Sequence, residues 1–251
     1  MTSSNRQSGI SAQPIIIQEP VHRNELLLRM YPADLALLRP HLQSVSLPLR
    51  TQLETAGAKI QAVYFFESGV GSVVAELSSA IEAEVGIIGF EGMTGSALIM
   101  GDDQSMHDCY VQVDADALSI DAGPFAAALA KSPTLRPFLL RYVHYFHLQA
   151  SYTGLINARL NIVGRLARWL LMCADRVERE RLAITHEFLS VMLGTRRPGV
   201  TIALQTLEGQ GLIRSTRGKV IIRDRAGLIE TAAGSYGKPE AEYARLIGQL
   251  H

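Results

Sequence analysis

Two helix signals and a hairpin signal stand together between Thr185 and Arg223, and this stretch limits the possible folds more than any other part of the chain. Thr185 suits a helix N-cap, because its hydroxyl can accept a hydrogen bond from a free backbone N–H. Gly194 suits the end of the first helix, because glycine tolerates the positive φ of a C-terminal cap. Pro198 fits the first turn of the second helix, where its missing N–H costs nothing. The spacing predicts two helices joined by a tight turn.

The second of these helices is predicted to have one buried face and one polar face. Apolar residues recur at i, i+3, i+4 and i+7, which is typical of a buried stripe. The stripe consists of Val200, Ala203, Leu204 and Leu207. Strand-like runs then flank the segment RSTRGK, and this pattern indicates a β-hairpin. The whole stretch predicts a winged helix-turn-helix, a motif whose second helix enters the major groove of DNA.

The expected DNA contacts divide into groups that read bases and groups that bind phosphates. Arg donates two hydrogen bonds to guanine, and Gln pairs in the same bidentate way with adenine. The candidate base-reading residues are Arg196, Arg197, Thr201 and Gln205, and Thr195, which can cap the second helix, is a further candidate DNA contact. The candidate phosphate contacts, which give affinity but little sequence information, are Arg214, Arg217 and Lys219, together with His186 as a phosphate contact or a solvated neighbour of the cap. The alternative is a helical hairpin with a solvated basic face.

Residues 185–222 resemble the DNA-binding end of the Crp/Fnr regulators, and the resemblance extends upstream. The segment NIVGRLARWLLMCADR (161–176) is similar to the helix that precedes the family's DNA-binding motif. The segments AVYFFESGVGSVV (62–74) and EVGIIGFEGMTG (84–95) are similar to its β-roll sensor. The resemblance implies an α+β fold. Its parts are an N-terminal antiparallel β-roll like the cyclic-nucleotide-binding jelly roll, a long dimerisation helix and a C-terminal winged helix-turn-helix.

The recognition helix departs from the family pattern at two positions. Family members commonly carry an Arg, a Glu and a second Arg there. Arg197 matches the first position, but Pro198 stands at the Glu position and Ile202 at the second Arg position. The base sequence preferred by better-known members is therefore not transferred to this chain.

Four segments are expected along the chain. They are a disordered or extended arm (1–20), a β-roll sensor (21–134), a dimerisation helix (135–160) and a winged helix-turn-helix domain (161–251). The arm is rich in Ser, Gln and Asn, whereas the sensor alternates short β-rich runs with glycine and acidic turns.

The charge distribution supports this division. The 251 residues carry no formal net charge as a whole. Residues 1–135 contain 7 Lys and Arg against 15 Asp and Glu, whereas residues 159–225 contain 13 against 6. The sequence therefore predicts an acidic module joined to a basic one, and the basic one has the charge expected for phosphate contact.

The long helix predicted for about 137–158 carries a seam with an average period of 3.5 residues, which suits pairing with a second helix. The seam is assigned to a dimer interface and comprises Phe138, Tyr142, Tyr145, Gln149, Tyr152 and Ile156. A second apolar stripe, Leu139, Val143, Phe146, Ala150 and Thr153, runs beside it. One stripe is expected to cover the β-roll and the other to meet a partner subunit, and the pattern leaves open which does which. A core helix within one chain is the alternative.

The resemblance also indicates where an effector pocket would lie. In cyclic-nucleotide-binding relatives a glycine-rich turn, a Glu and an Arg hold the nucleotide. The candidate pocket residues here are Gly89, Glu91, Gly92, Thr94, Gly95 and Ser96. No Arg occurs between Lys59 and Lys131, and a buried phosphate without a cation is costly. The sequence therefore predicts that cyclic AMP is not the effector. Another small molecule, a protein partner or no effector at all remain open.

Several function classes lack their motifs in this sequence. Two cysteines, Cys109 and Cys173, are too few for an iron–sulfur cluster. His144 and His147 share a helical face without an acidic or Cys ligand on the same turn, so they are interpreted as packed polar edges and no metal or cofactor is expected. No Walker loop or hydrolase motif occurs, and an enzyme is not expected. The chain has no signal peptide and no long apolar run, which favours a cytoplasmic location without membrane contact.

These patterns predict a sequence-specific DNA-binding transcription regulator that acts as a homodimer. The expected partners are a palindromic double-stranded DNA operator and a second copy of the chain, with RNA polymerase and an unidentified small-molecule effector as further candidates. The alternative is a ligand-binding or protein-interaction protein of the same architecture that has lost specific DNA binding. The residues at 198 and 202 keep this alternative open.

Overall fold

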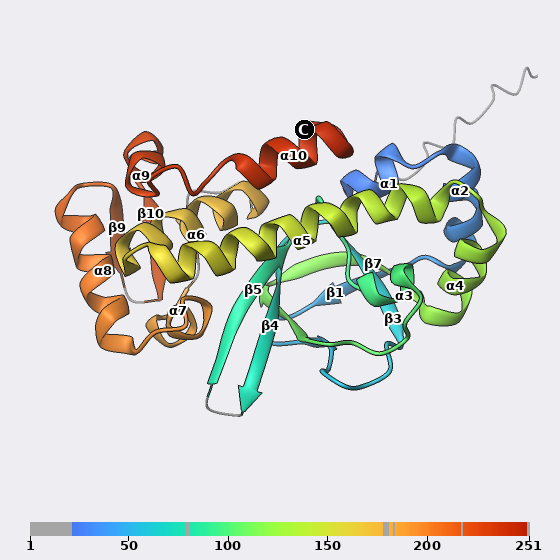
Figure 1. Ribbon diagram of the computed structural model, residues 1–251, viewed down its shortest axis with the longest axis horizontal. Coiled ribbons are helices and arrows are strands. Elements are labelled where there is room, and N and C mark those ends of the chain that lie inside the picture. Colours follow the sequence, from blue (N-terminus) through green and yellow to red (C-terminus); the bar gives the residue numbers. More distant parts are fainter. Residues whose placement is uncertain (1–21, 79–80, 178–180, 183, 217, 250–251) are drawn as a thin grey trace, which may run out of the picture.

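The computed structural model describes residues 22–249 except for residues 79–80, 178–180, 183 and 217. The expected N-terminal arm, residues 1–20, lies outside the described residues. A β-roll and a helical C-terminal half lie side by side, and one long helix, α5 (Leu135–Arg159), runs along both (Figure 1). The α+β architecture predicted from the sequence is thus confirmed.

The β-roll consists of two antiparallel sheets. One sheet has the order β1-β7-β3 and the other β2-β6-β4-β5. The strands are β1 (Gln43–Leu47), β2 (Gln52–Glu54), β3 (Ala62–Phe66), β4 (Val70–Ser78), β5 (Ile81–Ile88), β6 (Asp108–Val113) and β7 (Ala115–Asp121). Apolar side chains from both sheets, among them Phe66, Val73 and Val111, fill the space between them. Gly69 makes the turn before β4 at a φ of 75°, where an added Cβ would lie 2.4 Å from the carbonyl oxygen of Asp114.

Short helices cover one end of the roll. They are α1 (Glu25–Arg29), α2 (Pro32–Leu38), the 3₁₀ helix η1 (Arg39–His41), α3 (Ser96–Met100) and α4 (Ala122–Lys131). Asn24 caps α1 by accepting hydrogen bonds from two backbone N–H groups, and its amide donates to the carbonyls of Phe66 and Gly92. This side chain therefore links α1 to the glycine-rich turn of the sensor, residues 89–95.

The C-terminal half is a winged helix-turn-helix, as the sequence predicts. Its elements are α6 (Ile162–Val177), β8 (Arg181–Leu182), α7 (His186–Met192), α8 (Arg197–Gly209), β9 (Ile213–Thr216), β10 (Lys219–Ile222), α9 (Arg225–Thr231) and α10 (Lys238–Leu246). Thr185 caps α7 through its hydroxyl, and Gly194 follows the C-cap of this helix at a φ of 52°. Val200, Ala203, Leu204 and Leu207 are all buried. The strands form one small sheet in the order β8-β10-β9.

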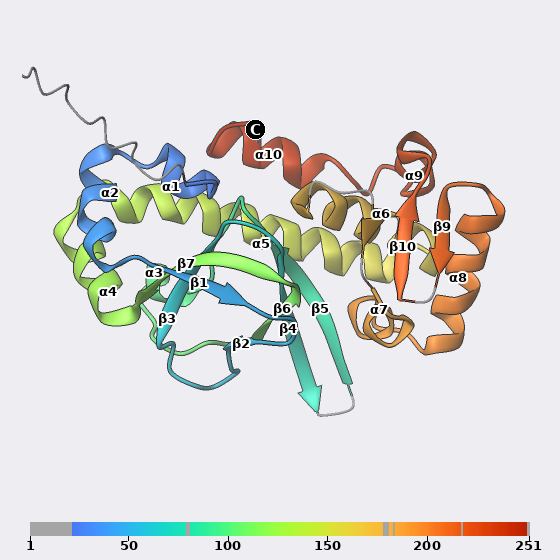
Figure 2. The same ribbon diagram turned by 180° about the vertical axis from the view of Figure 1, so that it is seen from behind.

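The two halves share one apolar core. Val70 and Val74 of β4 and Ile87 of β5 belong to the same buried cluster as the apolar residues of α6, α7 and α8. After α9 the chain returns to the sensor, and α10 lies along α5 (Figure 2). The ring of Tyr243 on α10 meets that of Tyr145 on α5 edge to face at 4.9 Å. Among the described helices, none combines the length and the apolar character needed to cross a lipid bilayer.

Candidate functional site

The outer face of α8 is polar and accessible. Arg196 and Arg197 begin the helix, and Gln205 lies two turns further on the same exposed side. Thr201 is half-buried between them, and Thr195 is half-buried in the preceding turn. The expected base-reading residues therefore share one surface, although their contact with DNA stays a prediction. Ile202 lies on this surface with 61% of its area exposed, and an apolar side chain there suits contact with a thymine methyl group.

Polar contacts within the motif hold two of these side chains in place. Arg197 Nη2 lies 2.8 Å from Glu187 Oε2 in an ion pair whose side chains are 61% and 65% exposed. His186 Nδ1 lies 3.2 Å from the hydroxyl of Thr201. Because Nη2 of Arg197 is engaged by α7, the ion pair with Glu187 competes with donation from this nitrogen to a guanine.

The hairpin β9–β10 supplies the expected phosphate contacts. Arg214 and Lys219 are exposed on its two strands, which pair from Lys219 with Thr216 to Ile222 with Ile213. Arg217 lies outside the described residues. Two cations beside the α8 surface extend the positive charge along the side on which a DNA backbone would lie.

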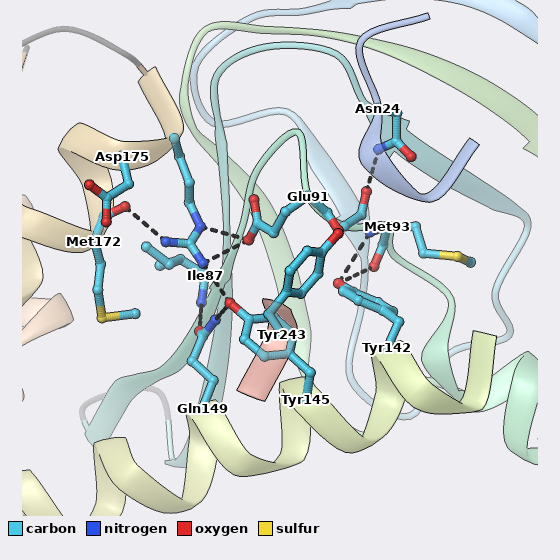
Figure 3. Close-up of polar contacts among 12 residues, drawn as sticks. Asn24, Ile87, Glu91, Met93, Tyr142, Tyr145, Gln149, Met172, Asp175 and Tyr243 are labelled. Atoms are coloured by element: carbon cyan, nitrogen blue, oxygen red, sulfur yellow. Dashed lines mark hydrogen bonds and ion pairs between the residues drawn. The ribbon is translucent and has the colours of Figure 1, made fainter. Parts of the chain in front are cut away.

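A buried ion pair joins the sensor to the DNA-binding half. Glu91 follows β5, and its Oε1 accepts from Nε and Nη2 of Arg176 on α6 at 2.8 and 2.7 Å. The side chains are only 2% and 4% exposed. The Tyr243 hydroxyl donates to the Glu91 carbonyl at 2.8 Å, so α10 joins the same cluster (Figure 3). Burial lowers the pKa of Arg176, but the attraction of Glu91 outweighs it, so that pKa is raised.

A second buried carboxyl group lies between the halves. Glu84 of β5 accepts hydrogen bonds from the Ser72 hydroxyl at 2.6 Å and from the indole N–H of Trp169, on α6, at 2.7 Å. Burial raises the pKa of Glu84 to about 8, although its two hydrogen bonds oppose the shift. The shift favours the uncharged form of Glu84 in the folded chain.

The assignment of the α5 seam to a dimer interface is wrong for most of its residues. Phe138, Tyr142, Tyr145, Gln149 and Ile156 are buried within the single chain, and only Tyr152 is half-buried. The Tyr142 hydroxyl donates to the Met93 carbonyl at 2.9 Å, and Gln149 Oε1 accepts from the Ile87 N–H at 2.7 Å (Figure 3). The seam is therefore the face of α5 that covers the β-roll and its glycine-rich turn.

A pocket of about 640 Å³ lies between the roll and α5. Thr94, Gly95 and Ser96, three of the residues assigned to an effector site, line it, and binding of an effector there stays a prediction. Gly89, Glu91 and Gly92 do not, and their assignment to the pocket is corrected. An added Cβ at Gly89 would lie 2.6 Å from Arg176 Cγ, and one at Gly92 would lie 2.5 Å from the Tyr142 hydroxyl. This part of the turn is thus packed against α5 and α6.

Glu54 is a pocket residue that the sequence did not reveal. Its Oε1 accepts from the Gly95 N–H at 2.6 Å, and its Oε2 accepts from the Ser105 hydroxyl at 2.8 Å. A carboxylate of the chain itself therefore occupies a backbone N–H of the glycine-rich turn. Because Glu54 lies 41 residues from Gly95 along the chain, no local pattern links the two.

The sulfur and histidine groups form no metal centre in the described part of the chain, where no cluster of three or more His, Cys, Asp or Glu is placed to hold an ion. Cys109 and Cys173 are free and buried, and burial raises the pKa of both thiols. Cys173 lies in the core shared by the two halves, as expected for a small apolar residue.

Residues 164–231 match the family model of the Crp-like helix-turn-helix domain. No curated protein is similar to the chain in sequence at a significant level.

The whole fold is similar to solved structures of transcription regulators. A protein classed in the Crp/Fnr family from Eubacterium rectale has a TM-score of 0.66 at 19% identity, over 83% of this chain and 97% of that one. A Crp/Fnr transcriptional regulator from Thermus thermophilus has a TM-score of 0.63 at 20% identity, over 76% and 98%. The c-di-GMP-responsive global regulator of Xanthomonas campestris has a TM-score of 0.60 at 18% identity, over 76% and 99%. At these identities the likeness shows the fold.

Proposed function

We propose that this chain, which combines a Crp-like helix-turn-helix domain with the Crp/Fnr fold, is a transcription regulator that binds a palindromic DNA operator as a homodimer. The single observation that carries the proposal is the exposed surface of α8, where Arg197, Thr201 and Gln205 lie together beside the basic hairpin. Interaction with RNA polymerase and a cytoplasmic location belong to the same proposal.

Dimer formation is expected on the face of α5 that the fold leaves open. This face, the pairing stripe, comprises Leu140, His144, His147, Ser151, Leu155 and Ala158. Its members are three or four residues apart, a spacing that keeps them on one face of the helix and suits contact with a second helix. Leu155 is 56% exposed, and the small Ser151 and Ala158 allow a second helix to approach closely. A dimer built on this stripe would present two α8 helices to successive major grooves.

Mobility shifts with genomic DNA fragments test the proposal. Arg197→Ala should weaken binding to a preferred fragment by about 1–3 kcal/mol and relax the sequence preference, because it removes a base contact. Lys219→Ala should weaken binding to all fragments about equally and reduce the salt slope by about 1, because it removes a phosphate contact. Lys131→Ala, on exposed α4 of the sensor, is the matched control. If the Arg197→Ala and Lys219→Ala proteins both bind DNA as the unaltered protein does, the proposed contact of α8 with DNA is refuted.

The alternative function, an interaction protein without specific DNA binding, rests on two residues of the recognition helix. The side chain of Pro198 has no hydrogen-bonding group, and Ile202 places an exposed apolar group on the surface of α8. This alternative predicts that the unaltered protein shifts no fragment in preference to another. It also predicts that Ile202→Ser impairs capture of a protein partner.

A further inference from the structure

We propose that the pocket between the β-roll and α5 binds an uncharged, largely apolar small molecule and excludes nucleotides. The proposal rests on the proposed function in one respect, since it identifies the ligand class of that regulator's effector site. It goes beyond the sequence-based prediction that cyclic AMP is not the effector, because it gives the chemical class of the ligand.

The size and walls of the pocket fit such a molecule. Its volume of about 640 Å³ falls in the range of about 300–1,000 Å³ that small-molecule sites occupy. The walls are formed by the β2-β6-β4-β5 sheet, by α3 and the turn before it, and by α5. The apolar side chains that line them include Val73, Val85, Ile88, Met93, Val143 and Phe146. Apolar walls on several sides favour a ligand that buries an apolar body.

The charges of the pocket are wrong for a phosphate. Among the residues that the structure describes, no Lys or Arg lines it, and Glu54 is the only formally charged lining side chain. That carboxylate already accepts from the Gly95 N–H, the turn position at which a phosphate oxygen would need a donor. A phosphate at this turn would lie beside a like charge and would lack a cation, and both effects oppose its burial.

Polar groups for orienting a neutral ligand are nevertheless present. His107 lines one side of the pocket, and His144 and His147 line the other from α5. Within the described part of the chain, none of these three imidazoles has a hydrogen-bond partner. Neutral imidazole offers one donor and one acceptor, so it suits a carbonyl or hydroxyl group of an uncharged ligand.

The rim of the pocket is apolar as well. Met100 and Met106 line it with 62% and 76% of their areas exposed, and Leu140 contributes from α5 with 41%. Methionine side chains adapt to irregular apolar shapes, which suits a site that an apolar molecule enters from water. Because Leu140, His144 and His147 also belong to the pairing stripe, an occupant would contact the helix that the proposed dimer uses.

Two dyes that differ by one charged group provide the test. N-phenyl-1-naphthylamine is neutral, and 8-anilinonaphthalene-1-sulfonate has the same ring system with an added sulfonate. We expect the full-length protein to bind the neutral dye more tightly, with cyclic AMP and cyclic di-GMP failing to displace it at millimolar concentration. Val143→Trp should fill the pocket and weaken the neutral dye at least about tenfold. Val45→Trp, at a half-buried valine away from the pocket, should leave it unchanged.

A charge variant tests the role of the carboxylate independently. Glu54→Gln should raise the affinity for the sulfonated dye several-fold relative to that for the neutral dye, because a like charge has been removed. Glu76→Gln, at an exposed position of β4, makes the same charge change outside the pocket and should alter neither dye.

Two results would overturn the ligand class: displacement of the neutral dye by a cyclic nucleotide, or equal dye affinity in Val143→Trp and Val45→Trp. Mobility shifts on the same preparations separate this failure from a failure of the proposed function. Dye binding as expected without any DNA shift would support the pocket proposal and reject the regulator. A cyclic nucleotide that displaces the dye and strengthens the DNA shift would reject the pocket proposal and support the regulator.

Discussion

Glu91 Oε1 lies 2.7 Å from Nη2 of Arg176, and this buried ion pair joins the glycine-rich turn of the sensor to the first helix of the DNA-binding half. The same guanidinium donates to the Met172 carbonyl at 2.8 Å and to the Tyr145 hydroxyl at 3.0 Å. Its donors therefore meet acceptors from the sensor turn, α5 and α6. The Arg176 guanidinium stabilises the contact between the two halves only while the Glu91 carboxylate is present as its countercharge.

Glu91→Ala is expected to reduce the free energy of unfolding by about 3–5 kcal/mol, because it leaves a buried guanidinium without a countercharge. Urea denaturation followed by circular dichroism measures the change. Glu91→Gln combined with Arg176→Met removes both charges and should cost less than the two single substitutions added together. Strict additivity would show that the two side chains do not interact in solution.

Glu84 predicts a pH dependence of stability. Burial raises the pKa of its carboxyl from 4.5 to about 8, so the folded chain holds this proton more tightly than the unfolded chain. The stabilising contribution is full below about pH 4.5 and is lost as the pH rises toward 8, by up to about 5 kcal/mol. Denaturation at a series of pH values between 5 and 8 measures this loss.

Glu84→Gln is the control for this prediction. The glutamine is uncharged at every pH, and its amide can accept from Trp169 and donate to the Ser72 hydroxyl. The variant should lose the part of the pH dependence that Glu84 supplies, so the difference between the two proteins should grow with pH. Parallel stability curves for both proteins would mean that Glu84 is already ionised in the fold.

The helix-turn-helix was predictable because its signals are local. Thr185 and Gly194 act on the backbone within a few residues, and such capping is visible in the sequence. The α5 seam shows the limit of periodicity. A 3.5-residue repeat identifies a buried face, but a face buried against the chain's own sheet and one buried against a second subunit have the same pattern. Tyr142 and Gln149 belong to the first kind.

The pocket was only half predictable for a different reason. Thr94 and Gly95 belong to a glycine-rich turn that the sequence displays, whereas Glu54 reaches this turn from β2 through the pairing of distant strands. Glu91 stands within the same turn but points to α6, which follows it by more than 70 residues. The direction of a side chain from an irregular turn depends on tertiary packing, and no spacing rule gives it.

The contact between Glu187 and Arg197 predicts a variant that binds DNA more tightly. Exposed ion pairs are worth about 0.2–1 kcal/mol, and this pair competes with the contact of Arg197 with a base. Glu187→Gln should therefore raise affinity for a preferred DNA fragment by up to about fivefold. Fluorescence anisotropy with a labelled fragment measures it, and Glu76→Gln gives the matched charge change on the sensor. Weaker binding by Glu187→Gln would show that the carboxylate positions Arg197 for its contact.

The pairing stripe of α5 predicts which substitutions separate the subunits. Leu155→Glu, with or without Ser151→Glu, should give the mass of a single chain in light scattering, because two like charges would meet across the twofold axis. Leu77→Glu is the control, since Leu77 is 88% exposed on β4 of the sensor. The separated chain should keep its fold, because both stripe residues are exposed and contribute little to the core. It should lose most of its affinity for a palindromic DNA fragment, because a single helix-turn-helix domain makes only half of the contacts. A Leu155→Glu protein that remains dimeric would place the subunit contact on another face.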